Sequence, residues 1–194
     1  MNIPKKYQDK TDLELVEFAK KDPEYFGLLM ARYEEPLSRY IKRISYFSEE
    51  DRKDILQEVF IKVYKNINDY DISLKFSSWI YRITRNHTID QIRKLNGKPA
   101  ISSLDNNELA NLVKSSIHLE KDFSKKDFLR TARQIINTLP LKYKEVLVLK
   151  FLEEKNYEEM MDILRKPKGS IATLVRRGRK LLLEKMKDQG IYRF

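Results

Sequence analysis

The chain has 194 residues, of which 41% are hydrophobic and 35% charged, and its formal net charge is +10 at pH 7. It contains no Cys and only two His, His87 and His118, which excludes disulfides, zinc fingers and thiol catalysis and leaves too few ligands for a typical histidine metal site. No run of about 18 apolar residues occurs and residues 1–10 are polar, so we expect neither a membrane span nor a secretory signal, and a cytoplasmic location.

The positive charge is concentrated near the C-terminus. Residues 1–96 hold 18 basic and 16 acidic side chains, residues 97–127 hold 5 and 5, and residues 128–194 hold 16 and 8. Residues 97–127 are rich in polar and turn-forming types, with a weak apolar pattern only around Leu109 to Val113. The sequence therefore predicts an all-α protein in which two small helical domains, 1–96 and 128–194, are joined by a flexible linker.

The first domain begins with helix-start signals. Thr11 and Glu14 form a capping box at the start of a short helix that contains Leu13, Val16 and Ala19. Asp22 with Pro23 starts another helix. Pro36 is expected to bend or interrupt this second helix. Its apolar stripe consists of Phe26, Leu29, Met30, Tyr33, Leu37, Tyr40, Ile41 and Ile44.

A third helix starts at Ser48 and has one acidic face. Its core positions are Leu56, Val59, Phe60, Val63 and Ile67, and the other face carries Asp51, Asp54, Gln57 and Glu58. Three interpretations are open for these side chains. They are a solvated surface, a docking surface for a basic helix of another protein, or, through Asp51, Asp54 and Glu58, a divalent-cation site for hydrolysis.

Aromatic and basic side chains alternate over the next segment. A loop over 69–78 ends at a serine N-cap, and a helix is predicted over 79–94. Arg82, Arg85, Asn86, Ile89 and Arg93 share one side of this helix, and Ile80, Ile83 and His87 lie opposite. Cations interleaved with rings suit single-stranded nucleic acid, whose bases stack on aromatic faces. The alternative is that Phe76 and Trp79 are core residues and that His87 is a packed histidine.

Residues 156–187 read as a helix-turn-helix. Asn156 and Glu159 cap a first helix whose apolar stripe is Tyr157, Met160, Met161 and Leu164, and Pro167 ends the turn. Ile171, Val175, Gly178 and Leu182 form the packing face of the second helix, with Leu174 and Leu181 beside them. Gly169 and Ser170 suit a helix N-terminus at which backbone amides approach a ligand closely.

The outward face of that second helix is basic. From residue 165 to residue 187 there are nine Lys or Arg against one acid, Glu184, a bias typical of a surface that binds DNA phosphates. The candidate DNA contacts are Lys168, Ser170, Thr173, Arg176, Arg177 and Lys180. A basic helix that touches a membrane, or only keeps the protein soluble, is the alternative.

Three segments in order resemble the extracytoplasmic-function sigma factors of bacterial RNA polymerase, a branch of the sigma-70 family. They are residues 54–67, 76–94 and 139–164 with the helix that follows. The resemblance implies that Asp54, Gln57 and Glu58 bind the clamp of core RNA polymerase. It also implies that Phe76, Arg82, Arg85, Asn86 and Arg93 contact the minus-ten promoter element, and that the second domain reads the minus-thirty-five element.

The resemblance further implies a promoter-specificity factor that is not an enzyme and needs no cofactor, metal or small-molecule substrate. Its partners would be core polymerase, promoter DNA and an anti-sigma factor, and a membrane-bound anti-sigma factor would hold it at the inner membrane face. The alternatives are a stand-alone helix-turn-helix regulator and a metal-dependent nuclease. The chain departs from the family pattern at four positions. Met161 stands where the family more often has a small residue, Arg165 where it more often has Gly, and Ala172 and Leu174 where it more often has basic residues. These departures leave the geometry of the turn and the base preference open.

Overall fold

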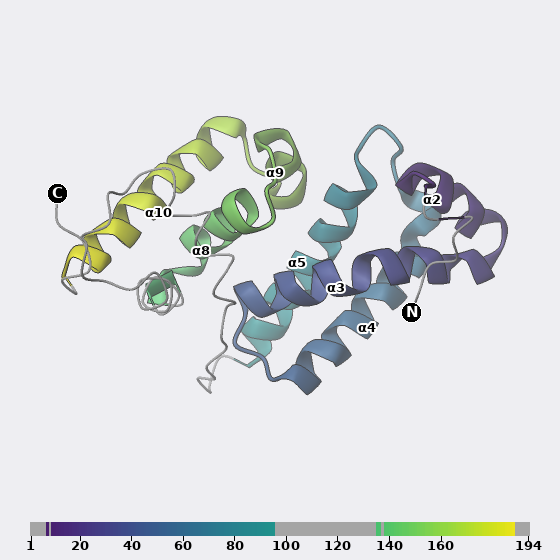
Figure 1. Ribbon diagram of the computed structural model, residues 1–194, viewed down its shortest axis with the longest axis horizontal. Helices are drawn as coiled ribbons and strands as arrows, with labels where there is room; N and C mark the ends of the chain where they lie inside the picture. The colour runs from purple at the N-terminus through teal and green to yellow at the C-terminus, as the bar shows by residue number, and fades with distance from the viewer. Residues whose placement is uncertain (1–6, 8, 96–134, 137, 189–194) are drawn as a thin grey trace. The chain divides into compact units, whose positions relative to one another are not determined.

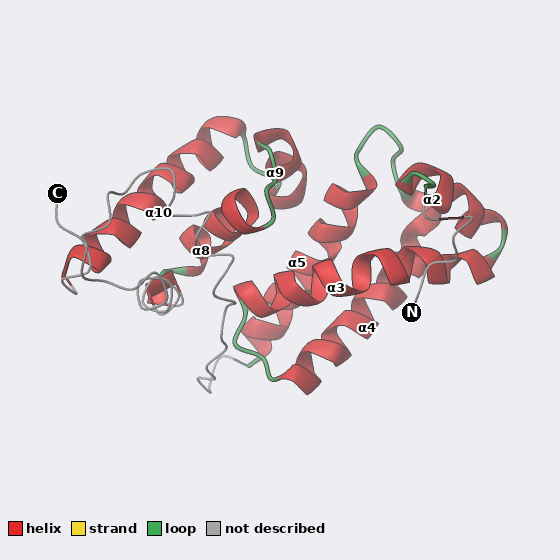
Figure 2. Ribbon diagram, in the orientation of Figure 1, coloured by secondary structure: helices red, strands yellow, loops and turns green. Residues whose placement is uncertain are grey.

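The computed structural model describes residues 7, 9–95, 135, 136 and 138–188 (Figure 1). The described residues form helices and loops and contain no strand, which confirms the all-α prediction (Figure 2). They fall into two compact units, one before and one after residues 96–134. The expected linker, 97–127, and its short apolar pattern at Leu109 to Val113 lie outside the described residues, so the boundaries after 96 and 127 stay predictions.

Helix α2 (Asp12–Lys21) starts at the predicted capping box. The Glu14 amide donates to Thr11 Oγ1 at 3.3 Å, and the Thr11 amide donates to Glu14 Oε2 at 2.8 Å. The helix buries Leu15, Val16 and Ala19, whereas Leu13 is 45% exposed. Leu13 is on the exposed side because a helical step of about 100° per residue places position 13 nearly opposite position 15.

Helix α3 (Phe26–Ile44) is the long central helix that the sequence predicts. Asp22 caps the 3-10 turn Pro23–Tyr25 that leads into it. The helix runs through Pro36 without interruption, so that part of the expectation is wrong. It is joined to α2 through Asp12, which accepts hydrogen bonds from Arg32 Nη1 at 2.8 Å and from the Tyr33 hydroxyl.

Helices α4 (Glu49–Asn66) and α5 (Phe76–Lys94) pack against α3 and against each other (Figure 1). A 3-10 turn, Ile67–Asp69, ends α4. Helix α5 begins at Phe76 with Lys75 as its N-cap residue, and Ser78 is buried inside the first turn. The predicted serine cap is therefore wrong, because burial of the Phe76 ring brings the chain into the helix earlier than the polar residues suggest.

The second unit consists of α8 (Leu141–Leu147), a π-helical turn (Val148–Leu152), α9 (Tyr157–Leu164) and α10 (Lys168–Asp188). The long helix α10 packs against both α8 and α9 (Figure 1). The predicted packing face of α10 is confirmed, with Ile171, Val175, Gly178 and Leu182 buried. In α9 the buried residues are Met160, Ile163 and Leu164, so Ile163 takes the core position that the sequence pattern assigned to Met161, which is only half-buried.

Candidate functional site

An acidic face lies along the solvent side of α4. Ser48 and Asp51 form the capping box that starts this helix, and Ile55, Leu56 and Val59 anchor its other side in the core. Asp54, Gln57 and Glu58 are consequently all exposed, as predicted. Ile61 continues the same face one turn further and is 53% exposed. Sequence reasoning missed Ile61, although its spacing of seven residues from Asp54 places it on this side.

The carboxylates of α4 do not converge on a common point. Asp51 accepts hydrogen bonds from the Ser48 amide at 3.2 Å and the Ser48 hydroxyl at 2.6 Å, so it completes the helix cap. Glu58 lies against His87 of α5. Within the described ranges, no group of three His, Cys, Asp or Glu side chains could hold a metal ion. The structure thus gives the nuclease interpretation no site among these residues.

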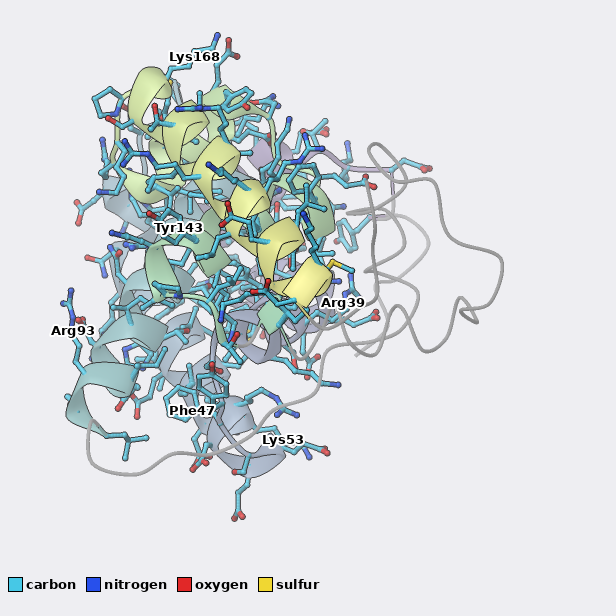
Figure 3. The ribbon with its side chains drawn as sticks, turned by 90° about the vertical axis from the view of Figure 1, so that its left-hand side faces the viewer. Arg39, Phe47, Lys53, Arg93, Tyr143 and Lys168 are labelled. Atoms are coloured by element: carbon cyan, nitrogen blue, oxygen red, sulfur yellow. The ribbon has the colours of Figure 1, made fainter. Side chains whose placement is uncertain are left out.

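The basic strip of α5 is the side of the helix that carries Arg82, Arg85, Asn86 and Arg93. It is narrower than the sequence suggests. Asn86 and Arg93 are exposed, and Arg82 and Arg85 are half-buried. Arg85 Nη1 donates to Asn86 Oδ1 at 3.1 Å, and Arg93 extends away from the ribbon in Figure 3. Ile89 is buried rather than grouped with these side chains, because α5 packs against α2, α3 and α4 and so has a wide packing face.

The rings near the start of α5 form a core cluster. Phe76 and Trp79 are 3% and 6% exposed, and their ring centroids lie 5.5 Å apart. Tyr33 and Tyr70 pack edge-on against Phe76 at 5.5 and 5.4 Å. Phe76 therefore presents no free ring face to a base in this structure, which corrects its assignment as an exposed DNA contact and favours the core interpretation.

His87 is a packed histidine whose two ring nitrogens face α4. Its side chain is 5% exposed, with Nε2 2.9 Å from Glu58 Oε2 and Nδ1 2.8 Å from Lys62 Nζ. Burial, and after it the Lys62 ammonium, lower the pKa of His87 below its ordinary value, while Glu58 opposes the shift. The ring is accordingly neutral near pH 7 and joins α5 to α4.

The helix-turn-helix is formed by α9 and α10 and begins at a confirmed capping box. The Glu159 amide donates to Asn156 Oδ1 at 2.9 Å, and the Asn156 amide donates to Glu159 Oε2 at 3.0 Å. Arg165 ends α9 in the left-handed region, with φ 52° and ψ 48°. This is the conformation for which glycine is favoured, so Arg165 carries backbone strain that a glycine there would avoid.

The basic face of α10 is exposed as predicted. Lys168, Ser170, Arg176, Arg177 and Lys180 are all on the surface, and Figure 3 shows Lys168 extending outward at the start of the helix. Thr173 is half-buried, and its hydroxyl donates to the Gly169 carbonyl at 2.9 Å. At the two positions of α10 where the family more often has basic residues, Ala172 is exposed and Leu174 is half-buried.

An open groove of about 620 Å³ runs beside this face. Arg176 and Lys180 line it together with Arg179 and Lys187, two cations that sequence reasoning did not select. The Arg179 guanidinium lies 5.8 Å from the centre of the Phe151 ring. Arg179 and Lys187 thus share the side of α10 that carries Arg176 and Lys180, which could have been recognised because positions 176, 179, 180 and 187 follow helical spacing.

The second unit is thus a helix-turn-helix with a basic outer face, and the first unit carries an acidic helix packed beside a partly basic one. Residues 29–97 match the family described as sigma-70 region 2, and residues 129–182 match the one described as sigma-70, region 4. The pattern of surfaces and these two matches define a helical DNA-binding protein of the sigma-70 type.

Individual relatives narrow this class. The chain is 36% identical to the ECF RNA polymerase sigma factor SigW of Bacillus subtilis, over 71% of this chain and 76% of the relative. It is 27% identical to the ECF RNA polymerase sigma-E factor of Escherichia coli K12, over 91% and 94%. The chain belongs to the ECF sigma factors.

Solved structures share the fold. CnrH, solved in complex with the cytosolic domain of CnrY, superposes with a TM-score of 0.66 at 19% identity over 91% of this chain and 97% of that one. RpoE of Bartonella quintana, solved with the anti-sigma factor NepR, gives 0.61 at 20% identity over 84% and 96%. None of the helices in the described part of the chain is long and apolar enough to cross a membrane.

Proposed function

We propose that the chain binds core RNA polymerase through the acidic face of α4, contacts the minus-ten element through α5 and reads the minus-thirty-five element through α10. The observation that supports the proposal is the packing of α4 against α5, because it brings an exposed acidic face and a partly basic side onto two adjacent helices. On α4 the contacts are Asp54, Gln57 and Glu58.

On α5 the DNA contacts are Arg82, Arg85, Asn86 and Arg93, which differ in role. An arginine on a phosphate adds affinity for every sequence alike, whereas an amide can bond a base edge. Asn86 is exposed, and the Arg85 guanidinium that bonds its Oδ1 holds the amide in one orientation. Asn86 is therefore the base reader of this helix, and the arginines hold the backbone.

On α10 the contacts are Lys168, Ser170, Thr173, Arg176, Arg177 and Lys180. Arg177 lies one turn from Thr173 and two turns from Ser170, so it faces the groove of the DNA and reads a base, while Arg176 binds the DNA backbone. Ala172 and Leu174 offer no cation at their positions, and base preference at the minus-thirty-five element therefore depends mainly on Arg177.

The chain catalyses no reaction and takes no cofactor or small-molecule substrate; its partners are core polymerase, promoter DNA and an anti-sigma factor. The protein RpoE of Bartonella quintana has been solved with such an inhibitor, and CnrH with the cytosolic domain of CnrY, which supports the last of these. The site of action is the cytoplasm, where a membrane-bound inhibitor would hold the chain at the inner membrane face. A regulator that binds DNA alone would leave the acidic face of α4 without a role.

Charge reversal on α4 tests the proposal. Asp54→Lys is the sharper variant because Glu58 also bonds His87, and the double reversal of Asp54 and Glu58 to Lys should abolish binding. We expect Asp54→Lys to weaken the affinity for core polymerase at least about tenfold, since it places like charges against a basic surface. Glu17→Lys on α2 reverses another exposed acid outside this face and should bind as the wild type does. Unchanged binding of the double variant would refute the assignment of this face.

A further inference from the structure

The buried imidazole of His87 contacts two surface side chains that lie one helical turn apart on α4. His87 Nε2 is 2.9 Å from Glu58 Oε2, and Nδ1 is 2.8 Å from Lys62 Nζ. The histidine side chain is 5% exposed, whereas that of Glu58 is 54% exposed. One buried side chain of α5 thus restricts the positions of two solvent-facing side chains of α4.

The chemistry of these neighbours fixes the proton on the ring. A lysine ammonium only donates hydrogen bonds, so Nδ1 must accept the bond from Lys62 and carries no proton. The proton of the neutral ring is then on Nε2, which donates it to the Glu58 carboxylate. Gln91 Nε2, also from α5, lies 3.4 Å from the same Glu58 oxygen. The geometry therefore restricts a carboxylate that would otherwise rotate freely in solvent.

We infer that His87 is a positioning residue for polymerase binding, which acts by holding the Glu58 carboxylate in one orientation on the acidic face of α4. The inference rests on the proposed function, in which Glu58 contacts core polymerase. A long surface side chain loses rotational freedom when it enters an interface, and a side chain that is already ordered loses less. Since the restraint comes from α5, the helix proposed to contact the minus-ten element also shapes the polymerase-binding face.

The test is a double-mutant cycle on the affinity of the full chain for core polymerase, with His87→Leu and Glu58→Ala made singly and together. His87→Leu should weaken binding by about threefold to tenfold, the range that corresponds to ordering one side chain. It should have no further effect when Glu58 is already Ala. His87→Gln keeps an amide donor near the Nε2 position and should restore binding to within about twofold of the wild type. Circular dichroism and thermal unfolding confirm that each variant is folded.

The outcomes separate this inference from the proposed function. If neither Asp54→Lys nor Glu58→Ala weakens binding, the face of α4 does not contact polymerase and the proposed function fails. If Asp54→Lys weakens binding and Glu58→Ala does not, only the positioning role of His87 is overturned. That role is also overturned if His87→Leu has no effect, if its effect is equal in both Glu58 backgrounds, or if His87→Gln binds as weakly as His87→Leu.

Discussion

Gly178 of α10 lies directly against Leu147 of α8, so closely that a Cβ atom at position 178 would be 3.3 Å from Leu147 Cγ. The same atom would lie 3.3 Å from Cβ of Tyr143. The contact allows the long helix of the second unit to approach α8, and a side chain at position 178 would require Leu147 or Tyr143 to shift. The packing of α10, whose other face carries the proposed minus-thirty-five contacts, thus depends on a residue without a side chain.

Gly178→Leu should therefore destabilise the protein by about 1–3 kcal/mol, the usual effect of forcing extra atoms into a packed interior. The measurement is chemical unfolding followed by circular dichroism. Gly169→Ala is the matched control, because nothing lies within 4 Å of a Cβ there and alanine has the higher helix propensity. Equal stability of the two variants would mean that α8 and α10 are not closely packed at Gly178.

Asn86→Ala should weaken opening of the minus-ten region while the affinity for core polymerase stays unchanged. Asn86 is exposed on α5, and loss of one base-edge contact corresponds to about 1 kcal/mol or more, at least about fivefold in the opening equilibrium. Fluorescence of a base analogue placed in the minus-ten element measures opening. Wild-type opening by this variant would show that Asn86 is a surface residue only.

Arg177→Ala and Arg176→Ala should have different effects on promoter binding. Both side chains are exposed on α10, and Arg176 lines the groove that also contains Lys180. Loss of Arg177 should relax the base preference at one or two minus-thirty-five positions by about 1–3 kcal/mol. Loss of Arg176 should weaken binding to all promoter sequences by the same factor. It should also lower, by about one unit, the slope of the logarithm of the binding constant against the logarithm of salt concentration.

Binding of each arginine variant to a set of single-base promoter variants at several salt concentrations separates the two roles. A uniform loss for both variants would leave no base reader at Arg177. Wild-type binding by both variants would mean that this face of α10 does not enter the groove of the DNA.

Acidification should destabilise the first unit through His87. The folded pKa of His87 is below the unfolded value of 6.5, so the unfolded chain takes up the proton first as the pH falls. The charged groups that act on it are Lys62 and Lys94, which lower the pKa, and Glu58 and Asp90, which raise it. The stability associated with the neutral ring is complete above pH 6.5 and is lost as the pH falls through the folded pKa.

Unfolding free energies of wild type and His87→Gln, measured at about pH 7.5 and about pH 5.5, test this expectation. Between these two pH values the free energy of unfolding should fall further for the wild type than for the variant. The difference should be at most about 1.4 kcal/mol per pH unit, the value for a single proton. Identical slopes would show that His87 titrates normally in the folded protein.

Helix starts and apolar stripes were predictable because local chemistry determines them. Three capping boxes, at Thr11, Ser48 and Asn156, are present in the structure, and the first and last were predicted residue by residue. The packing face of α10 follows from periodicity alone, because Ile171, Val175 and Leu182 repeat at helical spacing. The exposure of Asp54, Gln57 and Glu58 follows for the same reason.

The errors arise where tertiary packing overrides local signals. The Phe76 ring is buried against Tyr33, which is 43 residues earlier in the sequence, so an aromatic residue beside arginines is a core residue here. The π-helical turn Val148–Leu152 depends on how neighbouring elements meet, and no local pattern predicts it. The left-handed Arg165 stands where the family more often has Gly, so the departure from the family pattern did point to this position. The contact between His87 and Glu58 joins two helices and was likewise beyond a pattern read along one chain segment.

Transcription in vitro tests the central claim most directly. Purified core polymerase is supplied with a library of genomic templates, with and without the chain, and the 5′ ends of the RNA products are sequenced. We predict new start sites that depend on the chain and share a minus-ten and a minus-thirty-five element, and these starts should be lost with the Asp54 and Glu58 double reversal. Failure of the chain to direct any new start, with a core enzyme that responds to another sigma factor, would contradict the account.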